Sequence, residues 1–187
     1  MSTPLPHTSY HHGNLRHSLL DVALRVLERE GEAAVNLREL ARIVGVSPGA
    51  PYRHFQSRAA LLEALAVTGF QRFTKAMEEV ERSGSTDALA SMGKTYVLFA
   101  LHNRELFRLM FSPQLRRDNL PGLKMAASQA FATLRRVTDG GQPGGRVAAL
   151  AAWARVHGLA VLLLDGQIAI DAGEDIEALI SEIIGTP

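Results

Sequence analysis

The sequence of 187 residues predicts an all-α protein of about nine helices, in which a small N-terminal three-helix domain precedes a larger helical domain. Hydrophobic residues recur with the spacing of one helical face through most of the chain. No stretch alternates hydrophobic and polar residues for long enough to indicate a sheet. Hydrophobic residues make up 47% of the chain, so the protein has enough of them to bury a core.

Composition excludes several classes of protein. The chain contains no cysteine, so neither disulfides nor thiolate metal sites are available, and a reducing cytoplasm is the expected location. The longest apolar run, Val147 to Ala154, is far shorter than the roughly 20 residues of a membrane span. We therefore expect a soluble cytoplasmic protein without membrane contact, cofactor or metal.

Charge is unevenly distributed along the chain. Residues 1–58 carry seven arginines, five acids and five of the seven histidines, whereas residues 59–187 carry thirteen basic and fourteen acidic groups. This asymmetry favours a polyanionic partner for the N-terminal part. An ordinary mixed surface explains so small a difference about as well.

Capping signals divide the N-terminal part into helices. Hydrophobic spacing predicts a helix over residues 15–30 that ends at Gly31. Asn36 is an N-cap residue for a second helix that runs to about Val44, and Glu39 is placed to bond back to the Asn36 N–H as in a capping box. Gly45 ends that helix.

A third helix is expected to begin at Ser47, with Pro48 in its first position. The stretch 36–55, NLRELARIVGVSPGAPYRHF, then forms a helix-turn-helix in which Gly45 makes the turn and Val46 fills the core beneath it. In such a pair the second helix enters the major groove of DNA. A purely structural helical hairpin is the alternative that the pattern alone leaves open.

The third helix has little side-chain bulk in its first turns, because Gly49, Ala50 and Pro51 occupy them. Its backbone is therefore expected to approach DNA closely, while Tyr52 and His54 provide hydrogen-bonding tips.

Residues 10–62, from YHHGNLRHSLL to GVSPGAPYRHFQSRAALL, resemble the DNA-binding domain of TetR-type regulators almost position by position. The resemblance implies that Asn36, His54 and Arg58 contact the phosphate backbone and that residues 49–52 face the groove. The full set expected to contact DNA is Asn36, Leu37, Arg38, Ser47, Pro48, Gly49, Ala50, Pro51, Tyr52, His54 and Arg58.

Three histidines near the start, His7, His11 and His12, raise the question of a metal site. Adjacent histidines do not share a helical face, and no acidic ligand lies at zinc spacing nearby. Residues 1–10 are instead expected to form a mobile arm that, with His11 and His12, touches the DNA backbone.

From Arg58 the helical pattern is long and extends to about Arg82. We place the domain boundary inside this helix, with a head of residues 1–58 and a body of residues 59–187. Further helices are expected over residues 87–102, 104–110, 120–138, 146–164 and 175–184. A glycine-rich stretch, residues 139–145, is expected to be a flexible connection.

The body is expected to form a homodimer, because one helix-turn-helix contacts too few base pairs for selective binding. The last helix carries an apolar stripe that no later segment covers, and the helix before it is dense in small residues. The predicted dimer residues are Ala152, Leu159, Ile176, Leu179, Ile180 and Ile183. Packing of both helices inside one protomer is the alternative.

The segment 151–166, AAWARVHGLAVLLLDG, resembles the ligand domain of the TetR subgroup named for its Trp-His-Gly signature. A mostly apolar pocket for a small apolar or aromatic effector is expected, with His102 or His157 as a polar group. Its predicted lining is Phe99, His102, Phe107, Met110, Phe111, Met125, Phe131, Trp153 and His157. Each of these residues also fits an ordinary helical core.

Together these features predict a transcriptional repressor that binds double-stranded DNA at a palindromic operator and is released by its effector. No phosphate-binding loop, zinc-protease motif or nucleophile elbow occurs in the sequence, so we do not expect an enzyme. The main alternative is a TetR-like architectural factor that binds DNA or a protein without any small-molecule effector.

Overall fold

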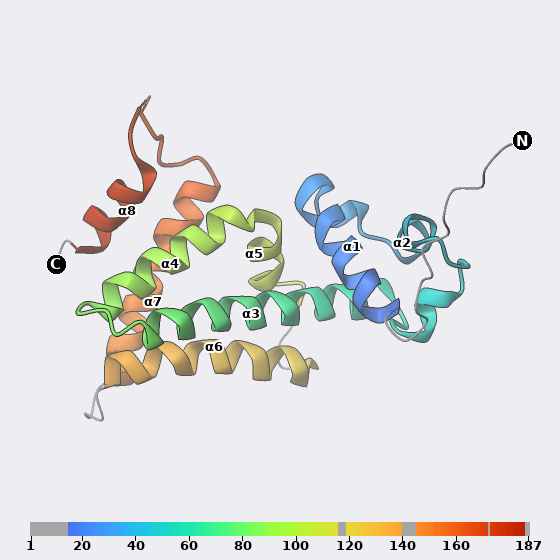
Figure 1. Cartoon of the computed structure of the whole chain (residues 1–187), viewed down its shortest axis with the longest axis horizontal. Helices are drawn as coiled ribbons and strands as arrows, with labels where there is room; N and C mark the ends of the chain where they lie inside the picture. Colours follow the sequence, from blue (N-terminus) through green and yellow to red (C-terminus); the bar gives the residue numbers. More distant parts are fainter. Residues whose placement is uncertain (1–14, 116–118, 140–144, 172, 186–187) are drawn as a thin grey trace, which may run out of the picture. The chain divides into compact units, whose positions relative to one another are not determined.

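The computed structural model describes residues 15–115, 119–139, 145–171 and 173–185 (Figure 1). The predicted arm with His7, His11 and His12, and most of the predicted glycine-rich connection, lie outside the described residues. Within the described residues the chain is helical and contains no strand. The α-helices are α1 (Leu15–Glu30), α2 (Leu37–Val44), α3 (Arg58–Arg82), α4 (Ala88–His102), α5 (Arg104–Met110), α6 (Pro121–Asp139), α7 (Gly145–Leu164) and α8 (Ile176–Gly185), with two 3-10 helices, η2 (Glu32–Ala34) and η3 (Ala50–Arg53).

The chain divides into two compact units, Met1–Leu61 and Leu62–Pro187. The helix α3 begins in the first unit and continues without a break into the second. The expected all-α fold with a helix-turn-helix followed by a larger helical body is confirmed.

The core of the first unit is built by α1, α2 and the segment after η3. Leu19, Ala23 and Leu27 recur at helical spacing on α1 and are fully buried. Leu40 of α2 and Phe55 complete this core. The guanidinium of Arg16 lies 5.2 Å from the centre of the Phe55 ring, a cation–π contact that covers the aromatic side chain.

Both ends of α2 are set by local chemistry. The Asn36 side chain accepts a hydrogen bond of 2.8 Å from the Glu39 N–H, as the predicted N-cap requires. Gly45 has a φ of 80°, and its N–H donates to the Ala41 carbonyl while Val46 donates to the same oxygen. The other half of the predicted capping box is wrong, because the Glu39 carboxylate binds Arg42 and not the Asn36 N–H.

The predicted third helix is also different from expectation. It is the four-residue 3-10 helix η3, and Ser47 is not its cap. An α-helix from Ser47 would need a hydrogen bond from residue 51 to the Ser47 carbonyl, and Pro51 has no N–H to donate. The Ala50 N–H donates to the Ser47 carbonyl instead, at 2.9 Å, and this hydrogen bond between residues three apart tightens the backbone into 3-10 geometry.

In the second unit α4 is the central helix, since α5, α6, α7 and α8 all pack on it. Gly93 of α4 permits close contacts with two of these helices. A Cβ atom at this position would lie 3.2 Å from Ile184 of α8 and 3.3 Å from Val156 of α7. The three helices therefore meet where the hydrogen of glycine fits, whereas a larger side chain would require Ile184 and Val156 to shift.

Polar contacts fix the remaining helices of this unit. Arg104 and Arg108 of α5 both donate to the Leu164 carbonyl at the end of α7, at 3.1 Å each. Arg108 also pairs with Asp165 at 2.7 Å. Arg136 of α6 pairs with Glu81 of α3 at 2.8 Å, and this contact lowers the pKa of the Glu81 carboxyl through its hydrogen bond to the guanidinium.

The cap at Gly45 generates a stability prediction. We expect Gly45→Ala to destabilise the first unit by about 1–2 kcal/mol, because an L residue is strained at this positive φ. Gly49→Ala is the matched control, since Gly49 has a φ of −86° and both glycines have open space where a Cβ would lie. Native-state hydrogen exchange of the α2 amides measures the difference. Equal opening free energies in the two variants would contradict the assigned cap.

Candidate functional site

The first candidate site is the exposed edge of the helix-turn-helix. Ser47, Pro48 and Gly49 are exposed in the turn that leads into η3, and Ala50 is half-buried. Tyr52 projects from η3 with 45% of its surface exposed although it is a large aromatic residue. A mostly bare backbone next to a protruding phenol is the shape expected of a segment that enters a DNA groove.

The helices α2 and η3 carry exposed arginines. Arg38 of α2 and Arg53 of η3 are exposed, and His54 follows directly. Arg53 was not among the residues predicted from the sequence, although its place next to Tyr52 was a usable signal. Arg42 is engaged within α2, where its Nε atom lies 2.9 Å from Glu39, and the same hydrogen bond lowers the pKa of the Glu39 carboxyl.

Two of the predicted contact residues have buried side chains. Leu37 is 4% exposed and belongs to the core of the first unit, so only its main chain is available to a phosphate. Pro51 is buried beneath η3 and does not face outward, because the 3-10 turn directs its ring to the core. Val46 was expected to fill the core beneath the turn, but it is only half-buried.

Arg58 and Asn36 are fixed by contacts within the unit. The Arg58 guanidinium donates to the Val35 carbonyl at 2.9 Å and to the Glu32 carbonyl, and therefore ties the start of α3 to η2. The side-chain oxygen of Asn36 is used by its cap. Both positions remain exposed, so phosphate contacts by them stay a prediction.

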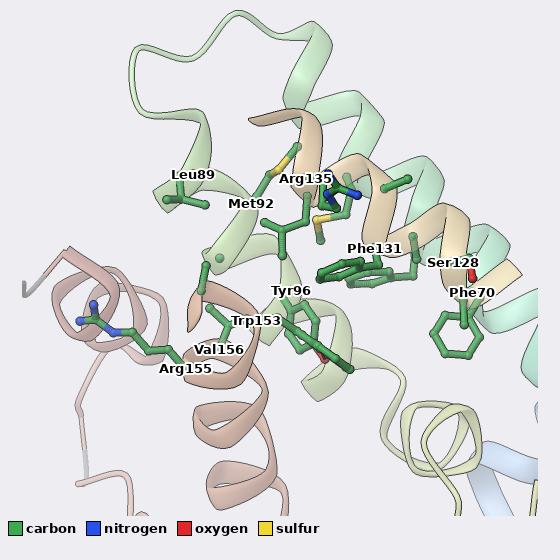
Figure 2. A pocket seen from close by; sticks show the side chains of 18 of the residues that line it. Phe70, Leu89, Met92, Tyr96, Ser128, Phe131, Arg135, Trp153, Arg155 and Val156 are labelled. Atoms are coloured by element: carbon green, nitrogen blue, oxygen red, sulfur yellow. Dashed lines mark hydrogen bonds between the residues drawn. The ribbon is translucent and has the colours of Figure 1, made fainter. Parts of the chain in front are cut away.

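The second candidate site is a cavity of about 590 Å³ in the second unit (Figure 2). Its volume lies within the range of small-molecule pockets, about 300–1,000 Å³. The lining residues come from α3, α4, α6, α7 and α8, with Phe111 after α5. They are Phe70, Phe73, Met77, Leu89, Met92, Gly93, Tyr96, Phe111, Lys124, Ala127, Ser128, Ala130, Phe131, Ala132, Leu134, Arg135, Ala152, Trp153, Arg155, Val156 and Ile184.

Three of the nine predicted pocket residues, Phe111, Phe131 and Trp153, line this cavity. Figure 2 shows Phe131 of α6 close to Trp153 of α7, and their ring centres are 5.9 Å apart. Phe99, Phe107 and His157 are not among the lining residues, but their rings contact two aromatic residues that are, Phe73 and Phe111.

The other predicted pocket residues are placed elsewhere. Met110 is 1% exposed and packs in the core, next to Gly69 of α3. His102 is exposed at the end of α4, so it is not the polar group of the cavity. Met125 is 62% exposed on the outer face of α6, because the helix turns it about 100° away from Lys124, which lines the cavity.

A polar chain of three aromatic residues crosses the inner wall. Trp153 Nε1 donates to Tyr96 Oη at 3.1 Å, and the same oxygen lies 2.8 Å from His157 Nδ1. Tyr96 is only 6% exposed, so this chain satisfies a phenol that burial would otherwise leave unpaired. The sequence reasoning identified Trp153 and His157 but missed Tyr96, which lies 57 residues before Trp153.

The predicted dimer residues have mixed positions in the protomer. Ile180 and Leu159 are buried within it, with 0% and 6% of their surfaces exposed, so they do not form an external interface. Ala152 lines the cavity. Ile176, Leu179 and Ile183 are half-buried on α8. Ile180 packs inside one protomer because α4 covers the face of α8 on which Ile180 lies.

The helix α7 carries an apolar stripe that the protomer leaves largely uncovered. Val147, Ala151 and Ala154 are exposed, Gly158 is half-buried and Val161 is 36% exposed. Among the described helices α7 alone is long and apolar enough to suit a membrane span, with a mean hydropathy of 1.9 and one third of that window buried. A single helix of this kind is weak evidence for a membrane, since core helices of soluble proteins share these properties.

Comparisons with known proteins identify both units. Residues 19–65 match the family described as "Bacterial regulatory proteins, tetR family", and residues 89–186 match "Tetracyclin repressor-like, C-terminal domain". Among curated proteins, the nucleoid occlusion factor SlmA of Haemophilus ducreyi is 32% identical over 116 residues, or 60% of this chain and 57% of that protein. The chain thus spans somewhat more than half the length of that relative.

Solved structures agree with this match. A protein of unknown function from Rhodococcus sp. RHA1 superposes with a TM-score of 0.82 at 34% identity, over 95% of both chains. The regulator FadR of Bacillus subtilis, solved in complex with stearoyl-CoA, superposes with a TM-score of 0.67 at 18% identity, over 90% of this chain and 95% of that chain, and so shares the fold.

The matches do not identify the Trp-His-Gly subgroup, which stays a prediction from residues 151–166. The two family matches together extend over the helix-turn-helix and most of the second unit. The chain therefore belongs to the TetR family of helix-turn-helix transcriptional regulators.

Proposed function

We propose that this regulator is a cytoplasmic homodimeric repressor without enzymatic activity, which binds a palindromic operator and releases it when a small effector enters the cavity. The observation that carries the proposal is the combination of a bare, exposed helix-turn-helix edge in one unit with an apolar cavity of about 590 Å³ in the other. The same helix, α3, contributes to both units.

DNA recognition is assigned to the segment from Ser47 to His54. Glycine and alanine at positions 49 and 50 let the backbone approach base edges, and the Tyr52 hydroxyl supplies a hydrogen-bonding group. Arg38 and Arg53 supply charge for phosphates on either side. Phosphate contacts determine most of the affinity and its salt dependence, whereas groove contacts determine the sequence preference.

Dimerisation is assigned mainly to α7. The exposed stripe of Val147, Ala151, Ala154, Gly158 and Val161 has alternating spacings of four and three residues, the pattern of helices that pack along a seam. Small residues at its centre allow a partner helix to come close. Leu179 and Ile183 of α8 are half-buried and stay candidates for the same interface, whereas Ile180 and Leu159 are needed inside the protomer.

Coupling between effector and DNA is assigned to α3. This helix contributes Phe70, Phe73 and Met77 to the cavity, and at its first residue Arg58 is bonded to the Val35 carbonyl of the first unit. A ligand that binds more tightly to one position of α3 therefore lowers the population of protomer pairs whose first units fit two successive major grooves. The size of this shift is limited by the difference between the ligand's affinities for the DNA-binding state and the released state.

Two neighbours bear on the choice between an effector-controlled regulator and an architectural factor. The FadR structure of Bacillus subtilis contains stearoyl-CoA, and supports a small-molecule effector for a body of this fold. The SlmA relative is named a nucleoid occlusion factor, and supports the architectural alternative. The cavity favours the first function, because a body without a ligand needs no open space of this volume.

Two substitutions in the head test the assigned DNA contacts. We expect Tyr52→Ala to weaken binding to a duplex selected from random sequences by about tenfold and to reduce discrimination against mismatched duplexes. We expect Arg38→Gln to weaken binding to all duplexes alike and to lower the salt slope by about one. Fluorescence anisotropy at several salt concentrations measures both effects, with Arg146→Gln in the second unit as control. Unchanged affinity in both head variants would overturn the assignment.

A charge in the α7 stripe tests the dimer. We expect Ala154→Glu to convert a dimer into monomers, because association would bury an unpaired carboxylate, and to weaken operator binding in parallel. Met125→Glu places the same charge at an exposed apolar position of α6 and should leave the dimer intact. Analytical ultracentrifugation distinguishes the species. A monomeric unsubstituted protein at micromolar concentration, or a dimer that survives Ala154→Glu, contradicts this interface.

A further inference from the structure

The proposed DNA-contacting edge, residues 47–52, offers a base few backbone hydrogen-bond donors. Pro48 and Pro51 have no N–H group. The N–H groups of Ala50 and Tyr52 donate to carbonyls inside the same turn, at 2.9 and 3.3 Å. Most of the edge therefore has no backbone donor for a base, and its selectivity depends on side chains.

The side chains of this edge are also poor in hydrogen-bonding groups. A guanidinium or a carboxamide can bind two polar atoms of one base in the major groove, and residues 47–52 include neither. The polar side chains among them are the hydroxyls of Ser47 and Tyr52. A hydroxyl both donates and accepts, so it discriminates weakly between bases. The edge thus carries little sequence information in hydrogen bonds.

The accessible surface of the edge is apolar instead. Pro48 is exposed and Ala50 is half-buried, whereas Pro51 is buried beneath η3. Gly49, between the first two, has no side chain that would hold them away from a base. Among the four bases, only thymine presents an apolar group in the major groove, its C5-methyl.

We infer that Pro48 and Ala50 contact thymine methyl groups, and that each half-site of the operator is recognised at thymines. This inference rests on the proposed function of the edge as the DNA-contacting surface and names the base that it selects. The exposed arginines of α2 and η3 then contribute affinity through phosphates, which carry no direct sequence information.

The edge is held in one shape, as a contact with a methyl group requires. Attraction between apolar groups is short-ranged, and a gap of about 1 Å forfeits up to half of it. The Pro51 carbonyl accepts hydrogen bonds from the N–H groups of His54 at 2.9 Å and Phe55 at 3.0 Å. Because Pro51 and Phe55 are buried, the segment that carries Ala50 is anchored to the core of the first unit.

Arg53 provides the rival explanation. Ala50 and Arg53 are three residues apart in η3 and therefore lie on the same side of this 3-10 helix. An arginine that reaches a base binds the O6 and N7 atoms of guanine with two hydrogen bonds. In that case the half-site is recognised at guanine, and the loss of a thymine methyl has no effect on binding.

Uracil tests the inference directly, because it lacks the C5-methyl of thymine and keeps its hydrogen-bonding groups. We would select a duplex from random sequences with the full-length protein and then replace each thymine by uracil in turn. Fluorescence anisotropy at one salt concentration measures the affinities. At least one replacement in each half-site should weaken binding about fourfold, the effect of one buried methyl group. Uracil in the flanking sequence should have no effect.

Variants connect the effect to the two residues. In the double variant Pro48→Ala, Ala50→Gly the thymine and uracil duplexes should bind with equal affinity, because the apolar surface that contacts the methyl is removed. Pro121→Ala is the matched control, since it removes an exposed proline ring from the second unit, and it should keep the fourfold difference. The uracil scan with the unsubstituted protein tests the inference independently of these variants.

The outcomes separate this inference from the proposed function. Equal affinity for thymine and uracil at every position overturns the thymine contacts but leaves the edge as a DNA-binding surface. If 7-deazaguanine, which lacks the N7 acceptor, weakens binding where uracil does not, the recognition belongs to Arg53. A fourfold difference that survives in the double variant overturns the roles of Pro48 and Ala50. Failure of the full-length protein to retain any duplex overturns the proposed function as well.

Discussion

The left-handed turn at Gly45 is the constraint on which the first unit depends. It ends α2 at Val44 with the carbonyls of its last turn satisfied by the N–H groups of Gly45 and Val46. The chain then reverses over a few residues, and the burial of Pro51 and Phe55 fixes the next segment against the core. Because these anchors point inward, Ser47 to Gly49 and Tyr52 are left outside. A change in the turn would therefore move the whole proposed contact edge.

The second unit contains an open apolar cavity, and contacts between side chains of its walls stabilise the helices around it. Its aromatic rings support one another at edge-to-face angles around Tyr96, and the bonds of Tyr96 to Trp153 and His157 satisfy the polar groups of the wall. Close packing at Gly93 and the arginine contacts at the end of α7 hold the surrounding helices. The cavity is thus bounded by rigid contacts on several helices, as a preformed ligand site requires.

Local signals predicted local structure well. The Asn36 cap, the Gly31 and Gly45 ends and the bounds of α3 all depend on nearest neighbours, which the sequence records directly. The 3-10 form of η3 differs from the predicted α-helix because Pro51 has no N–H for the Ser47 carbonyl four residues earlier, an effect that the capping signals at Ser47 and Pro48 do not indicate. Contacts between distant segments were harder to predict. The apolar stripe of α8 can be buried equally well against a partner protomer or against α4, and Ile180 packs against α4. Tyr96 could not be paired with His157 before the tertiary contact was known.

In the proposed complex the edge from Ser47 to Tyr52 lies in the major groove of DNA, once in each protomer. Methylation interference on the duplex selected by the protein tests it most directly, because guanine N7 is exposed only in the major groove. We expect two clusters of interfering guanines whose centres are about 10–10.5 base pairs, or a multiple of that spacing, apart. A bound duplex in which no guanine methylation interferes, or in which only one cluster appears, would contradict it.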